Sequence, residues 1–257
     1  VEHGRGAFVD SGTSHSLPHF LAAIEAADLE PKDIDWVILT HVHLDHAGGA
    51  GQLMKHLPYA KLAVHPRGAR HMIDPSALIA GAAGVYGEDE VRRSYGEIVA
   101  VPAERVVEAS DGFVIDLAGR ALLCLDTPGH ARHHIAIHDD RSRAFFTGDT
   151  FGLSYRELDS PGGAFIIPTT SPVQFEPDAA HRSIDRMLGY EPDAMYLTHY
   201  GRVTDVARLA NDLHEVIDAM VAIAKRHARS TDCQQRIEAD FADLYVDRAQ
   251  RQGVTMR

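Results

Sequence analysis

Hydrophobic residues in the first quarter of the chain switch between short apolar runs and the three-to-four-residue spacing of amphipathic helices. The clearest helical stripe is formed by Leu17, Phe20, Leu21 and Ile24. The pattern predicts, in order, a strand at 6–10, a helix at 16–27, a strand at 34–40, a helix after Gly48-Gly49 and a strand at 61–65. This β-α-β-α-β order predicts helices packed on a sheet.

The remaining pattern divides into three stretches. Residues 67–100 suggest helical segments broken by Gly81, Gly84, Gly87 and Gly96, an insertion that could cover a site as a lid. Next come strands at 105–107, 112–116, 120–125, 133–138 and 144–147, a long loop at 151–177, a helix at 177–188 and a strand at 194–197. After His199, stripes at 206–224 and 237–245 predict two amphipathic helices, and any exposed share of them would form a homodimer contact.

Composition narrows the class of protein. The 257 residues are 45% hydrophobic and 24% charged, which is typical of a soluble globular protein, and no apolar run approaches the roughly 18 residues that span a membrane. The net charge of −12 argues against a nucleic-acid partner. With two cysteines and no signal-peptide pattern, a cytoplasmic location is expected. Because Val1 is not a start methionine, we expect the numbering to begin part-way into a longer natural sequence.

The richest chemistry lies in the segment Thr40-His41-Val42-His43-Leu44-Asp45-His46-Ala47-Gly48-Gly49, directly after an apolar strand. It holds three histidines and an aspartate within six residues, and imidazole and carboxylate are the usual ligands of a catalytic divalent metal. The strand-to-helix turn can direct His41 and His43 to one metal, and Asp45 and His46 to a second.

Three more polar residues follow predicted strands. They are His130 in Thr-Pro-Gly-His, Asp149 in Thr-Gly-Asp and His199 in Leu-Thr-His, and their small neighbours allow close backbone approach. With the first motif they supply five histidines and two aspartates, which predicts a metal site. Of the 17 histidines, seven are interpreted as ordinary surface residues: His3, His15, His19, His56, His181, His214 and His227.

The string HVHLDHAGG, followed in order by TPGH, TGD and LTH, resembles the metallo-β-lactamase fold superfamily over roughly residues 6–201. The resemblance implies an αββα sandwich, two mixed sheets face to face with helices outside, and a site at one edge. We therefore predict a catalytic domain at 1–201, with the 67–100 insertion, and a helical extension at 202–257 packed on it. Segments 65–68, 127–134 and 170–175 are similar to a poorly characterised bacterial and archaeal branch.

The superfamily pattern assigns ligands residue by residue. It gives His41, His43 and His130 to one metal, Asp45, His46 and His199 to the other, and Asp149 to both. Two cations about 3.5–4 Å apart can share a hydroxide whose pKa falls toward about 7. The expected cofactor is a pair of Zn²⁺ ions, with Fe or Mn as alternatives. Asp45 is expected to be both a ligand and the catalytic residue that orients the nucleophile.

Neighbouring groups are expected to support this centre. Asp10, Thr40 and Thr198 are candidates to orient the ligating imidazoles. Of the adjacent pair His133 and His134, one should face the site, and His134 is favoured. Tyr155 and Tyr200 are candidate hydrogen-bond donors to an oxyanion, whereas His65 and His71 are expected not to be ligands.

The leading hypothesis is a metallo-hydrolase acting on a small ester, thioester or lactone, in its most specific form a glyoxalase-II-like thioesterase. Phosphodiester hydrolysis stays open, although the acidic chain lacks the basic surface of a nuclease. A persulfide dioxygenase with one iron, held by the counterparts of His41, His130 and Asp149, is the redox alternative. β-Lactamase activity and a flavin-partnered diiron function fit this ligand set less well. A closed structural metal site fits poorly, because seven ligands exceed what such a site needs.

Overall fold

The computed structural model describes residues 1–171 and 173–254, and the chain divides into two compact units. Unit 1 contains residues 1–127 and 131–142, and unit 2 contains residues 128–130 and the chain from residue 143 onward. The predicted division at residue 201 into a catalytic domain and an extension stays a prediction. Within the described residues, no helix is both long enough and apolar enough to cross a membrane.

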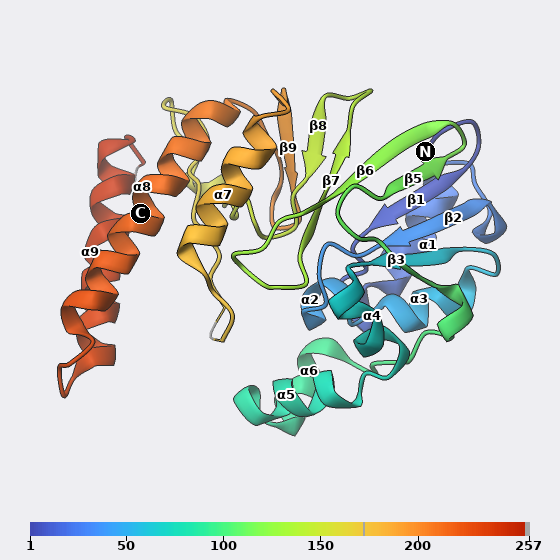
Figure 1. The fold of residues 1–257 in the computed structure, drawn as a ribbon, viewed down its shortest axis with the longest axis horizontal. Helices are drawn as coiled ribbons and strands as arrows, with labels where there is room; N and C mark the ends of the chain where they lie inside the picture. The colour runs from blue at the N-terminus through green and yellow to red at the C-terminus, as the bar shows by residue number, and fades with distance from the viewer. Residues whose placement is uncertain (172, 255–257) are drawn as a thin grey trace. The chain divides into compact units, whose positions relative to one another are not determined.

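Unit 1 begins with a parallel sheet covered by helices (Figure 1). Its strands, in spatial order, are β1 (Gly6–Val9), β2 (Ile34–Ile38), β3 (Lys61–Val64) and β4 (Val106–Glu108). A row of apolar partners, Phe8–Val37–Leu62–Val106, runs across the four strands. The helices beside this sheet are α1 (Leu17–Ala26), α2 (Leu44–Ala47) and α3 (Ala50–His56). Ile24 of α1 and Leu53 of α3 join the row in one hydrophobic core, as the stripe pattern predicts.

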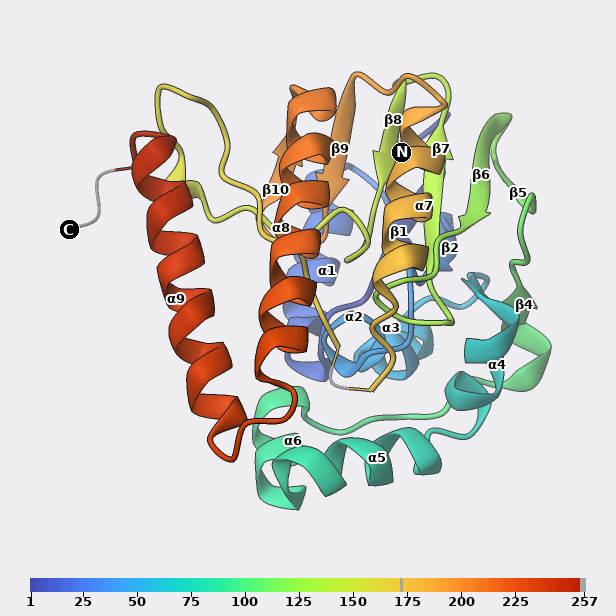
Figure 2. The same ribbon diagram turned by 60° about the vertical axis from the view of Figure 1, so that its left-hand side comes forward.

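The 67–100 segment is helical, but its glycines do not all act as predicted. The helices are α4 (Pro66–Ile73), α5 (Ser76–Tyr86) and α6 (Glu88–Tyr95). Gly81 and Gly84 lie inside α5, since glycine costs only about 1 kcal/mol in a helix, so the predicted breaks there are wrong. Gly87, at φ +88°, separates α5 from α6, which lie side by side (Figure 2). A lid role for this segment stays a prediction.

The other strands of unit 1 form an antiparallel run. It consists of β5 (Val114–Leu117), β6 (Arg120–Asp126) and β7 (Ile135–Asp139). All five residues of β7 are buried, and Cys124 of β6 is paired with Ile137 of β7. These strands agree with the predicted ones to within two residues at each boundary.

Unit 2 combines three strands with three long helices. β8 (Ala144–Phe146) is parallel to β9 (Ala194–Leu197), which is antiparallel to β10 (Gly201–Val203). The helices are α7 (Pro177–Leu188), α8 (Val206–His227) and α9 (Cys233–Arg251). Figure 2 shows α8 between α7 and α9, in contact with both. The predicted stripe of α8 is buried except at Ala224, which is exposed, and Leu209, Leu213 and Val216 are fully covered.

The predicted loop at 151–177 has some local structure. It contains isolated bridges between Leu153 and Ile167 and between Ser160 and Gly163. Pro172, within the 170–175 motif, lies outside the described residues. Short 3₁₀ helices complete the secondary structure at η1 (Ser14–Ser16), η2 (Pro31–Asp33), η3 (Ala103–Arg105) and η4 (Arg156–Leu158).

Leu62→Ala tests the core of unit 1. Leu62 is fully buried in the apolar row, so the substitution should lower the free energy of unfolding by about 2–5 kcal/mol. Denaturant titration gives the value, and Tyr59→Ala is the control because Tyr59 is 72% exposed and should change stability by at most about 0.5 kcal/mol. Equal effects of the two substitutions would contradict this core.

The two free cysteines should differ in reactivity. Burial raises the pKa of the Cys124 thiol to about 12, so almost no thiolate forms there near pH 8, whereas Cys233 is half-buried. A chromogenic disulfide reagent should therefore label Cys233 in the native protein and Cys124 only after unfolding. Rapid labelling of both thiols in the native state would show that Cys124 is accessible.

Candidate metal centre

The end of β2 presents the first group of donors in unit 1. The chain stays buried from Leu39 to Val42 and then enters the short helix α2, with His43 in an extended conformation at its N-cap. His41 and His46 are fully buried, whereas the Asp45 side chain is 46% exposed. The tight strand-to-helix turn therefore carries four predicted ligands within six residues of the chain.

Asp10, directly after β1, contacts the His46 imidazole and is linked to the His41 imidazole through Thr40. One oxygen of its carboxylate accepts hydrogen bonds from the Thr40 backbone N–H at 2.8 Å and from the Thr40 hydroxyl at 2.9 Å. The other oxygen lies 2.8 Å from Nδ1 of His46. The Thr40 hydroxyl also lies 3.2 Å from Nδ1 of His41. Both histidines thus have Nδ1 in contact with a polar group at the positions predicted for Asp10 and Thr40. The role of Asp10 and Thr40 in orienting metal ligands stays a prediction.

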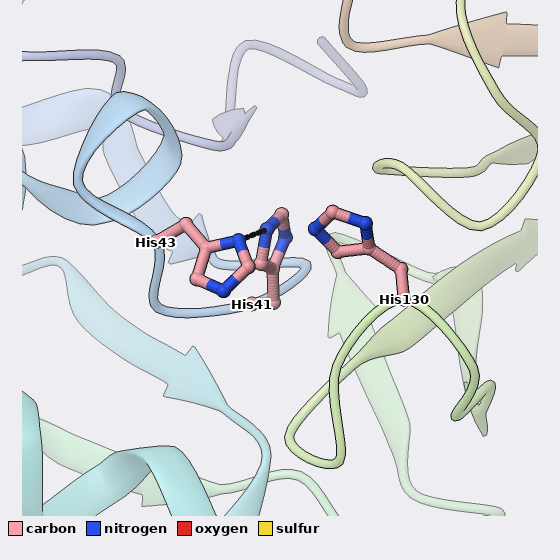
Figure 3. A group of neighbouring side chains, drawn as sticks. All are labelled: His41, His43 and His130. Atoms are coloured by element: carbon pink, nitrogen blue, oxygen red, sulfur yellow. Dashed lines mark hydrogen bonds between the residues drawn. The ribbon is translucent and has the colours of Figure 1, made fainter. Parts of the chain in front are cut away.

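The side chains of the four predicted ligands in unit 1 also contact one another. Nε2 of His41 lies 2.9 Å from Nδ1 of His43, with the rings nearly perpendicular (Figure 3). Nε2 of His46 lies 3.5 Å from Oδ2 of Asp45. The rings of His41 and His46 are 4.0 Å apart. Imidazole nitrogens and a carboxylate oxygen are the donor types that divalent transition metals bind.

Both histidines of the 133–134 pair lie beside His41, so the expectation that only one would is wrong. His134 is fully buried, its Nδ1 is 2.8 Å from the Thr127 hydroxyl, and its ring is stacked on His41 at 4.9 Å. His133 contacts the His43 ring at 5.6 Å and the His41 ring at 6.2 Å. Burial lowers the pKa of His133 to about 3, so it is neutral in the native protein. The alternation rule fails because β7 begins only at Ile135.

Unit 2 brings together the other three predicted ligands, with Asp149 in contact with both His130 and His199. Oδ2 of Asp149 lies 3.4 Å from Nε2 of His130, and Oδ1 lies 3.3 Å from Nε2 of His199. His130 and Asp149 are buried, whereas the His199 side chain is 31% exposed. Each carboxylate oxygen of Asp149 therefore faces a different imidazole, which is the arrangement that a bridging ligand requires.

The loop that carries His130 depends on a close approach to α7. Gly129 has φ +137°, and a Cβ there would lie 2.5 Å from the backbone of Ala180. The Gly129 carbonyl accepts a hydrogen bond from the Glu176 N–H at 2.8 Å. Only glycine fits both the conformation and the space, which explains the Thr-Pro-Gly-His motif.

Thr169, which the sequence analysis did not single out, and Ser171, which it named only as part of the 170–175 motif, hold the candidate ligands of unit 2. The Ser171 hydroxyl donates to the His130 carbonyl at 2.7 Å, and the Thr169 hydroxyl donates to the Asp149 carbonyl at 2.7 Å. The Thr169 carbonyl lies 3.5 Å from Nδ1 of His130. Their position in a Ser/Thr/Pro-rich loop was the available signal, but nothing in the sequence paired them with those two residues.

The remaining candidates fall into two groups. Tyr155 and Tyr200 are exposed, their rings are 4.5 Å apart, and a hydrogen bond with Tyr155 raises the pKa of Tyr200. Their role toward an oxyanion stays a prediction, as does the orienting role of Thr198. His65 has Nδ1 bound by the Arg67 N–H at 3.0 Å and Nε2 at 3.1 Å from Asp126, which fits a structural residue rather than a ligand.

The donor set fits divalent transition metals. All seven predicted ligands belong to groups of side chains that could hold a metal ion: His41, His43, Asp45, His46, His130, Asp149 and His199. Imidazole and carboxylate without thiolate suit zinc, iron and manganese alike. The chemistry of the donors thus supports a metal centre without selecting the metal.

Comparison with known proteins defines the class. The sequence profile of the Metallo-beta-lactamase superfamily matches residues 1–199, so this chain belongs to that superfamily. The predicted fold class, two sheets flanked by helices, is thereby confirmed. The superfamily protein ST1585 from Sulfolobus tokodaii has a similar structure, with a TM-score of 0.66, 26% identity, and coverage of 85% of this chain and 77% of that one.

Two relatives are named as hydrolases. The chain is 28% identical to a hydroxyacylglutathione hydrolase of Acidiphilium cryptum, over 89% of this chain and 74% of that protein. It is 30% identical to the human acyl-coenzyme A thioesterase MBLAC2, over 55% of this chain and 52% of that protein. A protein named TTHA1623, solved in a di-iron-bound form, shares the fold with a TM-score of 0.53, 24% identity, and coverage of 80% of this chain and 86% of that one.

Asp10→Asn tests the orienting network. Asparagine tolerates the φ of +60° at this position, but only one end of its amide can accept hydrogen bonds, whereas both oxygens of the carboxylate can. We expect metal affinity to fall about 10–100-fold, measured by competition with a chromogenic chelator. Glu25→Gln, which alters an exposed carboxylate on α1, should leave the affinity unchanged, and the same loss in both variants would contradict a specific role for Asp10.

Proposed function

We propose that the protein is a dinuclear metallo-hydrolase that cleaves thioesters, and that its centre uses the seven predicted ligands. His41, His43 and His130 are proposed to hold one ion, and Asp45, His46 and His199 the other. The observation that carries the proposal is Asp149, whose two oxygens each face a different imidazole at 3.3–3.4 Å. A carboxylate placed in this way is suited to join two cations.

Zinc is the proposed metal, with iron as the competing one. The five imidazoles favour zinc or iron over magnesium and calcium, which prefer oxygen ligands. When bound, such ions supply Lewis acidity toward the scissile carbonyl and bring the pKa of a water close to about 7.

The chain's own residues prepare this chemistry. Thr40 and Asp10 contact Nδ1 of His41 and His46 and are proposed to hold the proton on that nitrogen, so that Nε2 of each ring would bind the metal. Asp45 is half-exposed near the start of α2, and its carboxylate is proposed to orient the attacking water. Buried His134 is stacked on His41 and limits the motion of that ring.

The relatives support a thioester as the substrate class. Hydroxyacylglutathione hydrolase and acyl-coenzyme A thioesterase are both named for acyl groups carried by a thiol-containing molecule. For this reason we propose a thioester as the substrate rather than a simple ester or a lactone. The assay with acyl-coenzyme A and acylglutathione determines which thiol carrier is preferred.

Asp149→Asn is the decisive variant. Losing the charge that joins both halves of the proposed centre should remove at least one metal ion per chain and lower thioester hydrolysis by about 10²–10⁴-fold, since Lewis-acid stabilisation is worth several kcal/mol. Elemental analysis measures the metal, and release of free thiol from acyl-coenzyme A and acylglutathione measures the activity.

Asp243→Asn on the exposed face of α9 is the matched control and should behave as wild type. Full metal content and full activity in Asp149→Asn would refute the proposed centre. One iron per chain in the wild type, with oxygen uptake on a glutathione persulfide and no thioester cleavage, would replace the hydrolase with a dioxygenase.

A further inference from the structure

A second histidine–aspartate cluster lies within unit 2, where α7 packs against α8. Nδ1 of His181 on α7 is 2.5 Å from Nδ1 of His214 on α8, and the rings are stacked 4.8 Å apart. Each histidine also contacts an aspartate of the opposite helix. Nε2 of His181 is 3.2 Å from Asp218, and Nε2 of His214 is 3.1 Å from Asp185.

The outer contacts determine what can lie between the two rings. A carboxylate only accepts hydrogen bonds, so Asp218 and Asp185 each place a proton on the Nε2 that they face. In a neutral imidazole the other nitrogen then carries a lone pair. Two lone pairs, on Nδ1 of His181 and Nδ1 of His214, therefore point at each other, and a cation between them is needed to make the contact attractive.

We infer that this cluster, which we call the α7–α8 pair (His181, Asp185, His214 and Asp218), binds a divalent first-row transition-metal ion through the two Nδ1 atoms. A metal-ligating histidine usually donates its other N–H to a carboxylate, which is what Asp218 and Asp185 accept here. The two carboxylates also offset the two positive charges of the ion.

The geometry permits metal entry. The side chains of His181 and His214 are 23% and 24% exposed, so solvent reaches the rings, and open coordination positions would be filled by water. With zinc–nitrogen bonds of about 2.0–2.1 Å, two tetrahedral ligands lie about 3.3 Å apart. The nitrogens would separate by less than an ångström, which small rotations of the two imidazoles can supply.

The candidate metal centre gives an internal comparison. There, Nε2 of His41 and Nδ1 of His43 also face each other, at 2.9 Å, and the Nδ1 of His41 is held by Thr40. The α7–α8 pair repeats this arrangement of facing nitrogens with orienting groups behind them. His227 does not: its Nε2 lies 2.8 Å from Asp240, and no ring contact with a second histidine accompanies it in the described residues.

Zinc content measures the inference. The full-length chain and its His181→Ala and His214→Ala variants are dialysed against one buffered concentration of free Zn²⁺, and zinc per chain is determined by elemental analysis. Each variant should hold one zinc fewer than the wild type and keep the wild-type hydrolytic rate. His227→Ala, which removes a histidine paired with an aspartate alone, should lose none.

Asp185→Asn and Asp218→Asn keep both nitrogen ligands and guard against misfolding of the alanine variants. Each should weaken zinc binding at this site about 10–100-fold, seen as a higher free Zn²⁺ concentration for the last equivalent. Equal zinc content in the wild type and in both histidine variants would overturn the inference and assign the contact to a shared proton. Wild-type zinc affinity in both asparagine variants would also overturn the inference.

Discussion

The buried carboxylate of Asp10 is the contact on which the donor-bearing end of unit 1 depends. A charge that is 4% exposed is costly unless it is fully hydrogen-bonded, and Asp10 obtains its partners from Thr40 and His46. The Asp10 N–H in turn donates to the Ile38 carbonyl at 2.8 Å, and the Ser11 N–H donates to the His46 carbonyl at 2.7 Å. The ends of β1 and β2 and helix α2 are therefore fixed together by one polar network.

In unit 2, neutral groups rather than a carboxylate hold the candidate ligands in place. Thr169 and Ser171 hold the backbones of Asp149 and His130 through hydroxyl–carbonyl hydrogen bonds of 2.7 Å, and Gly129 lets the His130 loop approach α7 closely. Fixing the backbone of a short loop limits where its side chain can reach. Each unit thus holds its own candidate ligands in place through local contacts, which lowers the ordering cost of binding an ion.

Features set by residues close together in the sequence could be predicted, whereas contacts between residues far apart in the sequence could not. Helix α7 and strand β9 match their predicted bounds at both ends, because Pro177 marks the helix start and four apolar residues mark the strand. Strand β10 was missed because it has three residues, two of them exposed. The seven donor positions could be named because each directly follows a strand or turn motif. The contacts of Thr169 with Asp149, and of His181 with His214, join segments 20 and 33 residues apart, and no local pattern encodes them.

Burial separates the two groups of facing imidazoles within this chain. Asp10, which orients His46, is almost fully buried, so its hydrogen bonds act in a low-dielectric interior and hold the ring firmly. Asp185 and Asp218 have side chains 68% and 78% exposed, where water and salt compete for the same contacts. An ion at the α7–α8 pair would therefore exchange readily, and its occupancy would follow the free metal concentration. An ion bound by imidazoles that Asp10 orients would stay bound at much lower free metal concentrations.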